Sequence, residues 1–587
     1  MIDSQKHKDV YEQVSACLAR ALEDLMSEYE VESCSVLDEM RRGARVMSRP
    51  TDASHGDLAT NLPFKLAKEF RRKPLDIAGD LANKFVGPAT AKPAAPGFVN
   101  FTLDSEFLIN QLTRVGGETW GTNTLGEGKR VNLEYVSANP TGPLHVGHGR
   151  GAVIGDVAAR LLTNAGYDVT REYYLNDEGG QIEALGASLL SSARIQSGED
   201  DGGYERGYKG DYIDELAKTY LEAGMPISKK GDAAVLESAS DFASKKLLED
   251  ILDDLKKLDI TFDHVQSEKA IHPRIESVIS RYREKDLLYE ADRALGSENK
   301  KRRGDSQAAL HSEGMEGGTF LRTSKFGDDD DRIILRKDGR STYFTADIAY
   351  HLDKIDRKFD WLIDFWGADH GGHVKRLKAA LDALDTKIDF DVLLCQMVKL
   401  KRGDEEIKMS KRSGDMITLS EVTEEVGADA VRFFFLMRAH TAQMDFDLQL
   451  AVEKSSDNPV YYCQYAYART RQLLAKGKEF GLEPSSENLD VLTDQTELDI
   501  MRSLVQLPEF VRAAASRIEV HRLPEAAMEL AGMLHRYQTS GKLNENLRIV
   551  RADEPKISSA RLYLIGKVGD TMKWILDLMG VSAPERM

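Results

Sequence analysis

Hydrophobic and polar positions along the first part of the chain predict a small domain of mixed structure. Over residues 10–29 apolar side chains recur three or four positions apart, which predicts an amphipathic helix. A second helix is predicted over residues 62–70, and residues 97–103 alternate between apolar and polar as a half-buried strand does. The glycine-rich polar run over residues 116–128 predicts a linker. We therefore expect an N-terminal α/β domain over residues 1–118.

The pattern changes at residue 130, where strand and helix signals begin to alternate. A strand, a loop rich in proline and glycine, a long helix and a second strand are predicted in turn over residues 131–136, 137–143, 144–164 and 167–174. This order predicts a βαβ unit with a parallel sheet. Later apolar runs at residues 361–366 and 392–400 predict further strands of the same body, which we expect to extend over residues 119–448.

Two stretches depart from this alternation. Residues from about 195 to 330 are charged and predict a helix-rich insertion, with an exposed loop at residues 299–306. After about residue 450 strand signals fade and apolar residues recur at helical spacing. We expect residues 449–587 to form a C-terminal helical bundle.

Composition adds the size class and the expected compartment. A chain of 587 residues is too long for one hydrophobic core and predicts two to four domains. It has no apolar run of roughly 20 residues, and its first residues lack the basic-then-apolar order of a signal peptide. We therefore expect a cytoplasmic protein that does not associate with membranes.

Cysteine spacing and net charge restrict the candidate chemistry less strongly. The four cysteines, Cys17, Cys34, Cys395 and Cys463, include no C-x-x-C pair, which argues against a disulfide framework and against a structural zinc site. The net charge of -18 gives no support for a nucleic-acid partner. It does not exclude one, because a local basic surface can bind phosphates on an acidic protein.

The first motif with chemical meaning is Leu144-His145-Val146-Gly147-His148, directly after the proline- and glycine-rich loop. His145 and His148 are three residues apart, so in the first turn of a helix they project from one face. Free backbone N–H groups and the helix dipole favour a phosphate there, and Gly147 leaves room for a nucleotide to approach. Taken alone, the pair is equally well explained as two surface histidines or as half of a metal site.

The second motif is Lys408-Met409-Ser410-Lys411. It follows a predicted hairpin that turns at residues 402–404, and Thr418 with Glu421 predicts a capping box at the start of the next helix. A loop that carries two lysines could close over a departing pyrophosphate. For a lysine pair in isolation, a solvated basic turn would be the simpler explanation.

Together, and in this order, the two motifs resemble the HIGH and KMSK signatures of class I aminoacyl-tRNA synthetases, and the second matches letter for letter. The resemblance covers almost the whole chain and is closest to the arginyl-tRNA synthetases. It is carried further by residues 134–145, 174–177, 343–351, 366–370, 457–462 and 584–587. It implies an α/β fold whose catalytic domain has a Rossmann-like parallel sheet, with an N-terminal α/β domain and a C-terminal α-helical bundle.

The resemblance also implies an activity and a set of site residues. The activity is the ATP-dependent ligation of L-arginine to its tRNA through arginyl-adenylate, which releases AMP and pyrophosphate. The catalytic positions are His145, Gly147, His148, Lys408, Met409, Ser410 and Lys411. The positions that bind ATP are Pro140, Thr141, Gly142, Leu144, His145, His148, Gly367, Asp369, Met397 and Val398. Those that bind arginine are Glu134, Ser137, Asn139, Tyr343, Asp347 and His370.

The chemistry of arginine supports part of this assignment independently. A guanidinium group offers five N–H donors and no acceptor, so its pocket needs carboxylate or carbonyl oxygens. Asp347 and Glu134 are the negative groups in the implied set, and we expect Asp347, with Tyr343, to contact the guanidinium. A pocket of this kind rejects smaller side chains by binding alone, which agrees with the lack of any sign of an editing domain.

ATP, Mg²⁺ and tRNA-Arg are the partners that the resemblance implies, with no zinc and no DNA, and the bacterial form of the family suggests a monomer. The N-terminal domain would reach the tRNA elbow and the C-terminal domain would read the anticodon. Bases could stack there on one or two of Tyr461, Tyr462, Tyr465 and Tyr467, with core roles for the others. Many members of the family have a degenerate KMSK motif, so the intact motif here leaves open how strictly arginine activation requires tRNA.

Three alternatives remain open. A cysteinyl-tRNA synthetase shares the class, but its zinc site needs cysteines that this catalytic region lacks. A class I ligase that acts on an acceptor other than tRNA would not need the helical C-terminal domain. A tRNA-binding regulatory protein without catalysis would not need His145, His148, Lys408 and Lys411 intact.

Overall fold

The computed structural model describes residues 9–50, 52–117, 119–292, 317–407 and 417–587. The chain forms two compact units. The first combines Met1–Asn123 with Ser455–Arg517 and Arg522–Met587, and the second combines Thr124–Lys454 with Ile518–His521. Within the described ranges, no helix is both long enough and apolar enough to cross a membrane.

A five-stranded parallel sheet forms the centre of the second unit. Its strands are β5 (Arg130–Glu134), β6 (Asp168–Leu175), β7 (His264–Ser267), β11 (Trp361–Gly367) and β12 (Asp389–Cys395). They lie in the order β12-β11-β5-β6-β7, and every neighbouring pair is parallel. Strands β6 and β7 therefore extend the sheet on one side of β5, and β11 and β12 extend it on the other. The boundary between β5 and β11 is a topological switch point, and in open α/β sheets ligands bind beside such a point. The predicted Rossmann-like sheet is confirmed.

Helix α6 (Val146–Asn164) crosses between β5 and β6, and α13 (Gly371–Asp382) crosses between β11 and β12. The predicted helix over residues 144–164 is confirmed, except that its first helical residue is Val146 and His145 is the N-cap. The interior glycines of α6 allow side chains of neighbouring segments to approach its backbone closely. A Cβ at Gly155 would lie 2.4 Å from Tyr135 Cγ, and one at Gly149 would lie 2.4 Å from Leu419 Cδ1.

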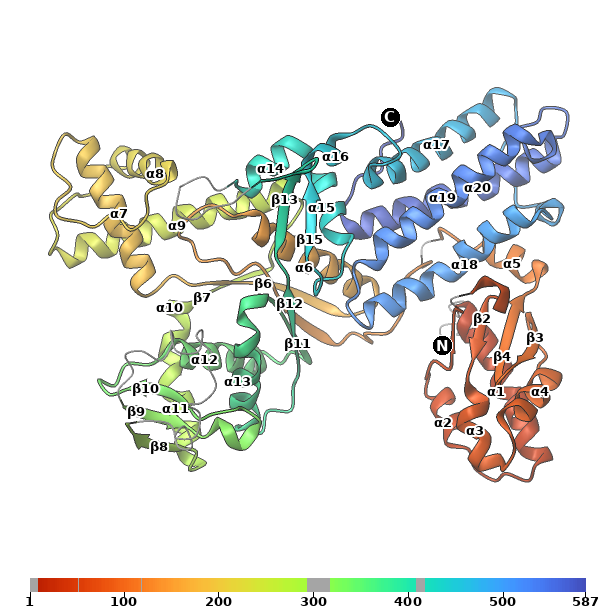
Figure 1. Cartoon of the computed structure of the whole chain (residues 1–587), viewed down its shortest axis with the longest axis horizontal. Coiled ribbons are helices and arrows are strands. Elements are labelled where there is room, and N and C mark those ends of the chain that lie inside the picture. The colour runs from red at the N-terminus through yellow and green to blue at the C-terminus, as the bar shows by residue number, and fades with distance from the viewer. Residues whose placement is uncertain (1–8, 51, 118, 293–316, 408–416) are drawn as a thin grey trace. The chain divides into compact units, whose positions relative to one another are not determined.

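The segment between β6 and β11 is richer in strands than its charged sequence predicts. Its helices α7 (Gly180–Gln196), α8 (Asp211–Glu222) and α9 (Ala233–Lys257) pack together (Figure 1). Their buried apolar side chains form a core of their own. The prediction of a helix-rich insertion over 195–330 is correct for α8 and α9 but misses β7, which belongs to the central sheet. Residues 299–306, predicted to be an exposed loop, lie outside the described residues.

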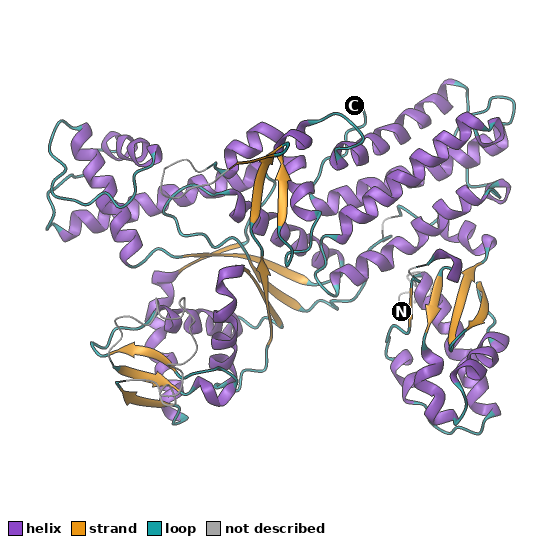
Figure 2. Ribbon diagram, viewed as in Figure 1, coloured by secondary structure: helices purple, strands orange, loops and turns teal. Residues whose placement is uncertain are grey.

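The same segment contains a second sheet. Strands β8 (Leu288–Ala291), β9 (Gly318–Leu321) and β10 (Arg332–Arg336) pair antiparallel in the order β10-β9-β8 (Figure 2). Helices α10 (Glu268–Ile271), α11 (Ile275–Glu284) and α12 (Tyr343–Asp356) join it to the central sheet. Strands of four or five residues carry too few alternating positions to be recognised in a charged sequence.

The apolar run predicted as one strand over residues 392–400 is two strands in two sheets, so that prediction is wrong. Strand β12 ends at Cys395, and β13 (Val398–Arg402) pairs with β14 (Glu405–Ile407) and β15 (Met444–Asp447). Between β12 and β13, Gln396 N donates a hydrogen bond to His440 O, and the chain leaves the central sheet at this point. The predicted hairpin at residues 402–404 and the capping box of Thr418 with Glu421 are both confirmed, the latter at the start of α14 (Leu419–Val426). Helices α15 (Ala428–Leu436) and α16 (Leu448–Val452) complete the unit.

The first unit contains an antiparallel sheet and a helical bundle. The sheet, in the order β1-β2-β4-β3, consists of β1 (Met47–Ser48), β2 (Leu58–Thr60), β3 (Ala89–Ala94) and β4 (Phe98–Leu103). Its helices are α1 (Val10–Glu28), α2 (Ser35–Arg41), α3 (Leu62–Phe70), α4 (Pro74–Lys84) and α5 (Ser105–Leu112), which confirms the two helices and the strand predicted there. The bundle consists of α17 (Pro459–Glu479), α18 (Gln495–Ala515), α19 (Arg522–Leu543) and α20 (Pro555–Met579). Among the described residues after 450 there is no strand, as predicted.

Candidate active site

The site predicted from the sequence gathers at the carboxyl ends of the parallel strands. The two histidines follow β5, the run 174–177 includes the end of β6, Asp369 and His370 follow β11, and Met397 follows β12. Because these strands are parallel, the segments that leave their carboxyl ends share one edge of the sheet. The fold therefore brings together residues that lie more than 250 positions apart in the chain.

His145 and His148 cap the start of α6 reciprocally. His145 Nδ1 accepts hydrogen bonds from the backbone N–H groups of Gly147 and His148 at 3.1 and 3.4 Å, and His148 Nδ1 accepts from His145 N at 3.5 Å. The two rings stack with their centroids 3.7 Å apart. An Nδ1 that accepts leaves Nε2 as the protonated nitrogen of a neutral imidazole. Both side chains can therefore present an N–H donor at the N-terminus of a helix, as a phosphate requires.

Gly147 has a local reason to be glycine. A Cβ at this position would lie 3.0 Å from His145 Cε1 and 3.1 Å from His145 Nδ1. The stacked arrangement of the histidines therefore depends on glycine between them, whether or not a nucleotide also approaches it.

The chain that follows the second motif returns to the histidines. Leu419 N donates to Leu144 O at 2.8 Å, and Thr418 forms a β-bridge with His145. Residues 408–411, the predicted KMSK positions, lie outside the described residues. Their hairpin β13–β14 and the anchor at Thr418 are both described, and the anchor lies beside His145.

The loop after β5 begins in a strained conformation. Val136 and Ser137 have φ angles of +69° and +40°, a region that costs a non-glycine residue roughly 1–3 kcal/mol. Ser137 is fixed in place because its Oγ donates to Glu134 Oε1 at 2.8 Å and accepts from Tyr174 N at 3.0 Å. Two of the predicted arginine-binding residues, Glu134 and Ser137, are therefore in direct contact.

Glu134 is buried and already engaged with a lysine that the sequence did not single out. Lys354 Nζ, fully buried on α12, donates to Glu134 Oε2 at 2.6 Å and to Asp364 Oδ1 at 2.9 Å. His351 places Nδ1 2.8 Å from Asp347 O and Nε2 2.8 Å from Asp364 Oδ2, so both ring nitrogens face oxygen acceptors, as an imidazolium requires. Burial acts to raise the pKa of Asp364, but Lys354 and His351 outweigh it and lower that pKa to about 2.

This network fixes α12 to the sheet, and α12 carries the predicted guanidinium contacts. Tyr343, at its first residue, is 61% exposed, and its hydroxyl would lie 3.0 Å from a Cβ added at Gly179. Asp347, one turn later, has Oδ2 2.7 Å from His373 Nε2. His373 lies three residues after His370 on the helix that follows β11, so the histidine spacing there was a signal that could have revealed it.

Glu268 is a functional candidate that the sequence did not reveal. It lies at the start of α10, directly after the short strand β7, and it is buried. Burial, followed by the charges of Asp347, Glu178 and Asp177, raises the pKa of Glu268 to about 7. We call these four acidic side chains the acidic wall. The charges of the other three disfavour ionisation of Glu268, so a cation that binds beside it gains electrostatic energy. A guanidinium is such a cation.

The predicted ATP-binding residues divide into exposed and buried positions. Thr141 and Gly142 lie half-buried in the loop after β5, and Leu144 has its side chain in the core. At the other strand ends Met397 is 74% exposed, whereas Val398 is buried at the start of β13. Pro140 lies in the loop after β5, Gly367 is the last residue of β11, and Asp369 follows in a short turn. Of the predicted arginine-binding residues, His370 ends the same turn, and Asn139 Nδ2 donates to Gln181 Oε1 at 2.8 Å.

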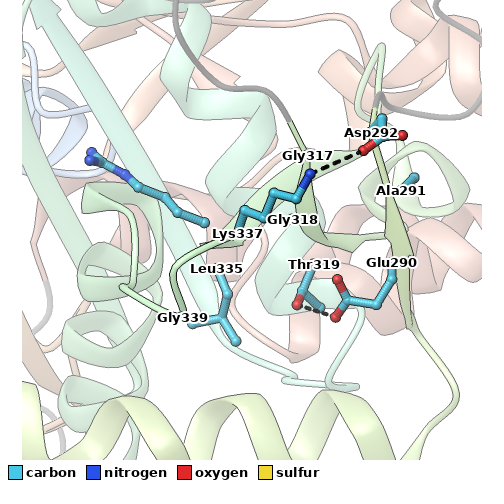
Figure 3. Close-up of a pocket in the computed structure, with 10 residues that line it drawn as sticks. Glu290, Ala291, Asp292, Gly317, Gly318, Thr319, Leu335, Lys337 and Gly339 are labelled. Atoms are coloured by element: carbon cyan, nitrogen blue, oxygen red, sulfur yellow. Dashed lines mark hydrogen bonds and ion pairs between the residues drawn. The ribbon is translucent and has the colours of Figure 1, made fainter.

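A hollow of about 390 Å³ lies elsewhere, on the antiparallel sheet β8–β10. Figure 3 shows Lys337 directed toward Asp292, with Nζ 3.9 Å from Oδ1, and Thr319 Oγ1 donates to Glu290 Oε1 at 2.5 Å. The residues that line this hollow include none predicted for the site. We assign no ligand to it.

Comparison with known families accounts for nearly the whole chain. Residues 115–436, more than half of it, match the family described as tRNA synthetases class I (R), catalytic domain. Residues 12–103 match the arginyl tRNA synthetase N terminal domain, and residues 463–587 match the DALR anticodon binding domain. The chain belongs to the arginyl-tRNA synthetase family.

Individual relatives agree with this family over nearly full length. The arginine--tRNA ligase of Citrifermentans bemidjiense is 39% identical over 594 residues, with 98% of this chain and 100% of the relative covered. That of Jannaschia sp. is 42% identical over 560 residues, with 94% and 95% covered. The structure of Thermus thermophilus arginyl-tRNA synthetase superposes with a TM-score of 0.72 at 21% identity, covering 98% of this chain and all of that one, and so supports the fold.

Membership of the arginyl-tRNA synthetase family removes two of the alternatives left open by the sequence. A cysteinyl-tRNA synthetase and a ligase for another acceptor would not match an arginyl N-terminal domain and an anticodon binding domain in one chain. The resemblance that the two motifs suggested is therefore confirmed for the family and the fold class, while the role of each site residue remains a prediction.

Proposed function

We propose that this chain joins L-arginine to its tRNA in two steps at the carboxyl edge of the central sheet. Membership of the arginyl-tRNA synthetase family supports the reaction and the use of ATP. The observation that carries the choice of amino acid is the acidic wall of Glu268, Asp347, Asp177 and Glu178. The paired histidines follow β5 and Glu268 follows β7, both at the carboxyl ends of strands of the same sheet. A site that has phosphate donors on one side and clustered carboxylates on the other suits ATP together with a cationic amino acid.

In the first step a carboxylate oxygen of arginine attacks the α-phosphorus of ATP. A new P–O bond forms, the bond to the β-phosphate oxygen breaks, and pyrophosphate leaves with the electron pair. In the second step a hydroxyl of the tRNA 3′ end attacks the carbonyl carbon of arginyl-adenylate, loses its proton and displaces AMP. Neither step needs a protein nucleophile, so the chain acts by positioning and by stabilising charge.

The paired histidines are proposed to act on the triphosphate. The Nε2–H groups of His145 and His148, together with the N-terminus of α6, would donate to phosphate oxygens as negative charge grows on the leaving group. We propose that Lys408, Met409, Ser410 and Lys411 approach from the hairpin β13–β14. Mg²⁺ would arrive bound to the phosphates of ATP, as is usual where it takes part in nucleotide chemistry.

Arginine would lie with its guanidinium toward the acidic wall and its carboxylate toward the histidines. Asp347 and Glu268 would accept from the guanidinium, with Tyr343 at the rim. Glu134, fixed by Ser137 and Lys354, would provide a negative charge for the α-ammonium group. Ser137, Asn139 and His370 complete the proposed arginine set.

The flanking domains are proposed to hold tRNA-Arg, with residues 1–118 at the elbow and residues 449–587 at the anticodon. The four predicted tyrosines differ in how deeply their side chains are buried. Tyr467 is buried and therefore suited to a core role, whereas Tyr465 is 37% exposed and stacks on Tyr461 with ring centroids 6.2 Å apart. We propose these two as stacking candidates in a monomeric, cytoplasmic enzyme.

ATP–pyrophosphate exchange tests the function. Exchange should require arginine among the amino acids, and comparing rates with and without tRNA-Arg shows whether activation depends on it. The variant His148→Ala should lower the exchange rate about 100-fold or more, while arginine binding measured by calorimetry stays unchanged. His55→Ala, an exposed histidine of the first unit, is the matched control and should behave as wild type. Exchange supported by another amino acid, or wild-type turnover in His148→Ala, would refute the proposal.

A further inference from the structure

The loop that follows β5 is tethered by residues of the helical segment α7–α8. Tyr212, in the first turn of α8, donates a hydrogen bond from its hydroxyl to Thr141 O at 2.7 Å. Gln181, in the first turn of α7, accepts from Asn139 Nδ2 at 2.8 Å. Helix α8, which lies in the predicted insertion, and helix α7, which precedes it, therefore both make direct polar contacts with the loop that follows β5.

This loop needs such tethers because it has little regular structure of its own. Residues 135–144 belong to no helix or strand, and two of them, Val136 and Ser137, have positive φ angles. Residues in that region persist when their surroundings over-determine them. At the start of the loop, Ala138 O accepts from Tyr173 Oη at 2.6 Å and Ser137 Oγ accepts from Tyr174 N. In its second half, Tyr212 is the side chain that fixes the Thr141 carbonyl.

The phenol of Tyr212 lies against the peptide it holds. A Cβ added at Gly142 would lie 3.3 Å from Tyr212 Oη, so the ring also limits where the Thr141–Gly142 backbone can lie. Burial raises the pKa of Tyr212 to about 12, so the hydroxyl remains a protonated donor at neutral pH. A hydrogen bond from a half-buried donor to a loop carbonyl restricts both the position and the orientation of that peptide group.

We propose that Tyr212 is a positioning residue for ATP binding. From helix α8, outside the parallel sheet and its loops, it holds Thr141 and Gly142 in place. The inference rests on the proposed function, since these two residues are proposed ATP contacts. It links α8, through Tyr212, to the nucleotide side of the site, whereas Gln181 of α7 contacts Asn139, a proposed arginine residue. No contact of Tyr212 with substrate is needed, so it is not itself a catalytic residue.

The substitution Tyr212→Phe removes only the hydroxyl and keeps the ring. The same helix offers a matched control, because Tyr220 Oη donates to another backbone carbonyl, Pro226 O, at 2.8 Å within the helical segment. Tyr220→Phe therefore loses the same kind of hydrogen bond at a position with no link to the loop. Both variants should fold, and both are assayed as full-length chains.

Steady-state ATP–pyrophosphate exchange and calorimetric titration with MgATP provide the readouts. We expect Tyr212→Phe to raise the KM and the Kd for ATP about two- to tenfold, with the KM for arginine unchanged. Tyr220→Phe should leave all three at wild-type values, although its Tm falls about as much. Equal ATP constants in the two variants, or a change in the arginine KM alone, would overturn the inference. Failure of the wild type to exchange with arginine in the presence of tRNA-Arg would instead overturn the proposed function, while calorimetry still tests the tether.

Discussion

At the scale of single residues, the ionisation of Glu268 decides how strongly the acidic wall attracts a cation. Its pKa is raised to about 7, first by burial and then by the charges of Asp347, Glu178 and Asp177. The folded protein therefore holds this proton more tightly than the unfolded chain, whose carboxyl keeps the ordinary value of 4.5. The contribution of Glu268 to the free energy of unfolding consequently falls as the pH rises from about 4.5 to about 7.

Arginine binding should show the opposite trend. Only the ionised carboxylate pairs with a guanidinium, so protonation competes with arginine below a pH of about 7. We expect the KM for arginine in the exchange assay to be about tenfold higher at pH 6 than at pH 8, with the KM for ATP much less affected. Glu268→Gln should raise the arginine KM at pH 8 and remove this pH dependence. Glu276→Gln, an exposed position on α11, is the control and should retain it.

The same residues show what could be predicted from the sequence at this scale. His145, His148 and Asp347 belong to motifs that could be read from the sequence. Glu268 and Lys354 were missed because their importance depends on what surrounds them. No local feature of the sequence indicates which of the 97 Asp and Glu residues will be buried beside three other carboxylates. A fully buried lysine between Glu134 and Asp364 is likewise a property of the fold.

At the scale of elements, α6 connects the site to the sheet, and its glycines determine how closely it packs. Four glycines lie between residues 147 and 155, an unfavourable composition for a helix interior, where each costs about 1 kcal/mol relative to alanine. Gly155 faces the Tyr135 ring at a distance that admits no Cβ, whereas a Cβ at Gly151 would meet nothing within 4 Å. The two positions therefore separate helix propensity from packing.

Alanine substitutions at these positions should have effects of opposite sign. Gly155→Ala should destabilise the second unit by about 1–3 kcal/mol, because the added carbon overlaps Tyr135 and moves α6. Gly151→Ala should stabilise it by about 0.4–1 kcal/mol, because it reduces the freedom of the unfolded chain without a clash. Urea denaturation followed by circular dichroism measures both. Destabilisation of equal size in the two variants would show that the close approach at Gly155 has no special cost.

Elements were predicted well where their pattern was long. The helices at residues 10–29 and 62–70 and the crossover helix α6 each repeat their apolar spacing over two or more turns, and the structure confirms them. Strands β7 to β10 have four or five residues each, and the mainly apolar run at residues 392–400 passes from one sheet into another with only Gln396 and Met397 between the two strands. Periodicity records how a segment is buried, but it does not identify the sheet to which a strand belongs.

At the scale of the whole molecule, the chain forms two compact units, each with its own pair of tryptophans. Trp120 and Trp574 lie in the first unit, with ring centroids 4.8 Å apart, and Trp361 and Trp366 lie in the second. These four are all the tryptophans of the chain. Trp366 also lies near the proposed site, with its ring centroid 5.5 Å from that of His373. Fluorescence can therefore report each unit separately.

Substrates should stabilise only the unit that binds them. The double variant Trp120→Phe with Trp574→Phe leaves reporters in the second unit, and Trp361→Phe with Trp366→Phe leaves reporters in the first. Saturation with ATP and arginine at about 100 times their Kd should stabilise the second unit by about 2.7 kcal/mol per ligand, so its thermal transition rises. The thermal transition of the first unit, reported by Trp120 and Trp574, should keep the same midpoint temperature. This is expected because the proposed small-molecule site lies wholly in residues of the other unit. If both transitions rise together, the two units unfold as one cooperative body, and binding in one must then be transmitted to the other.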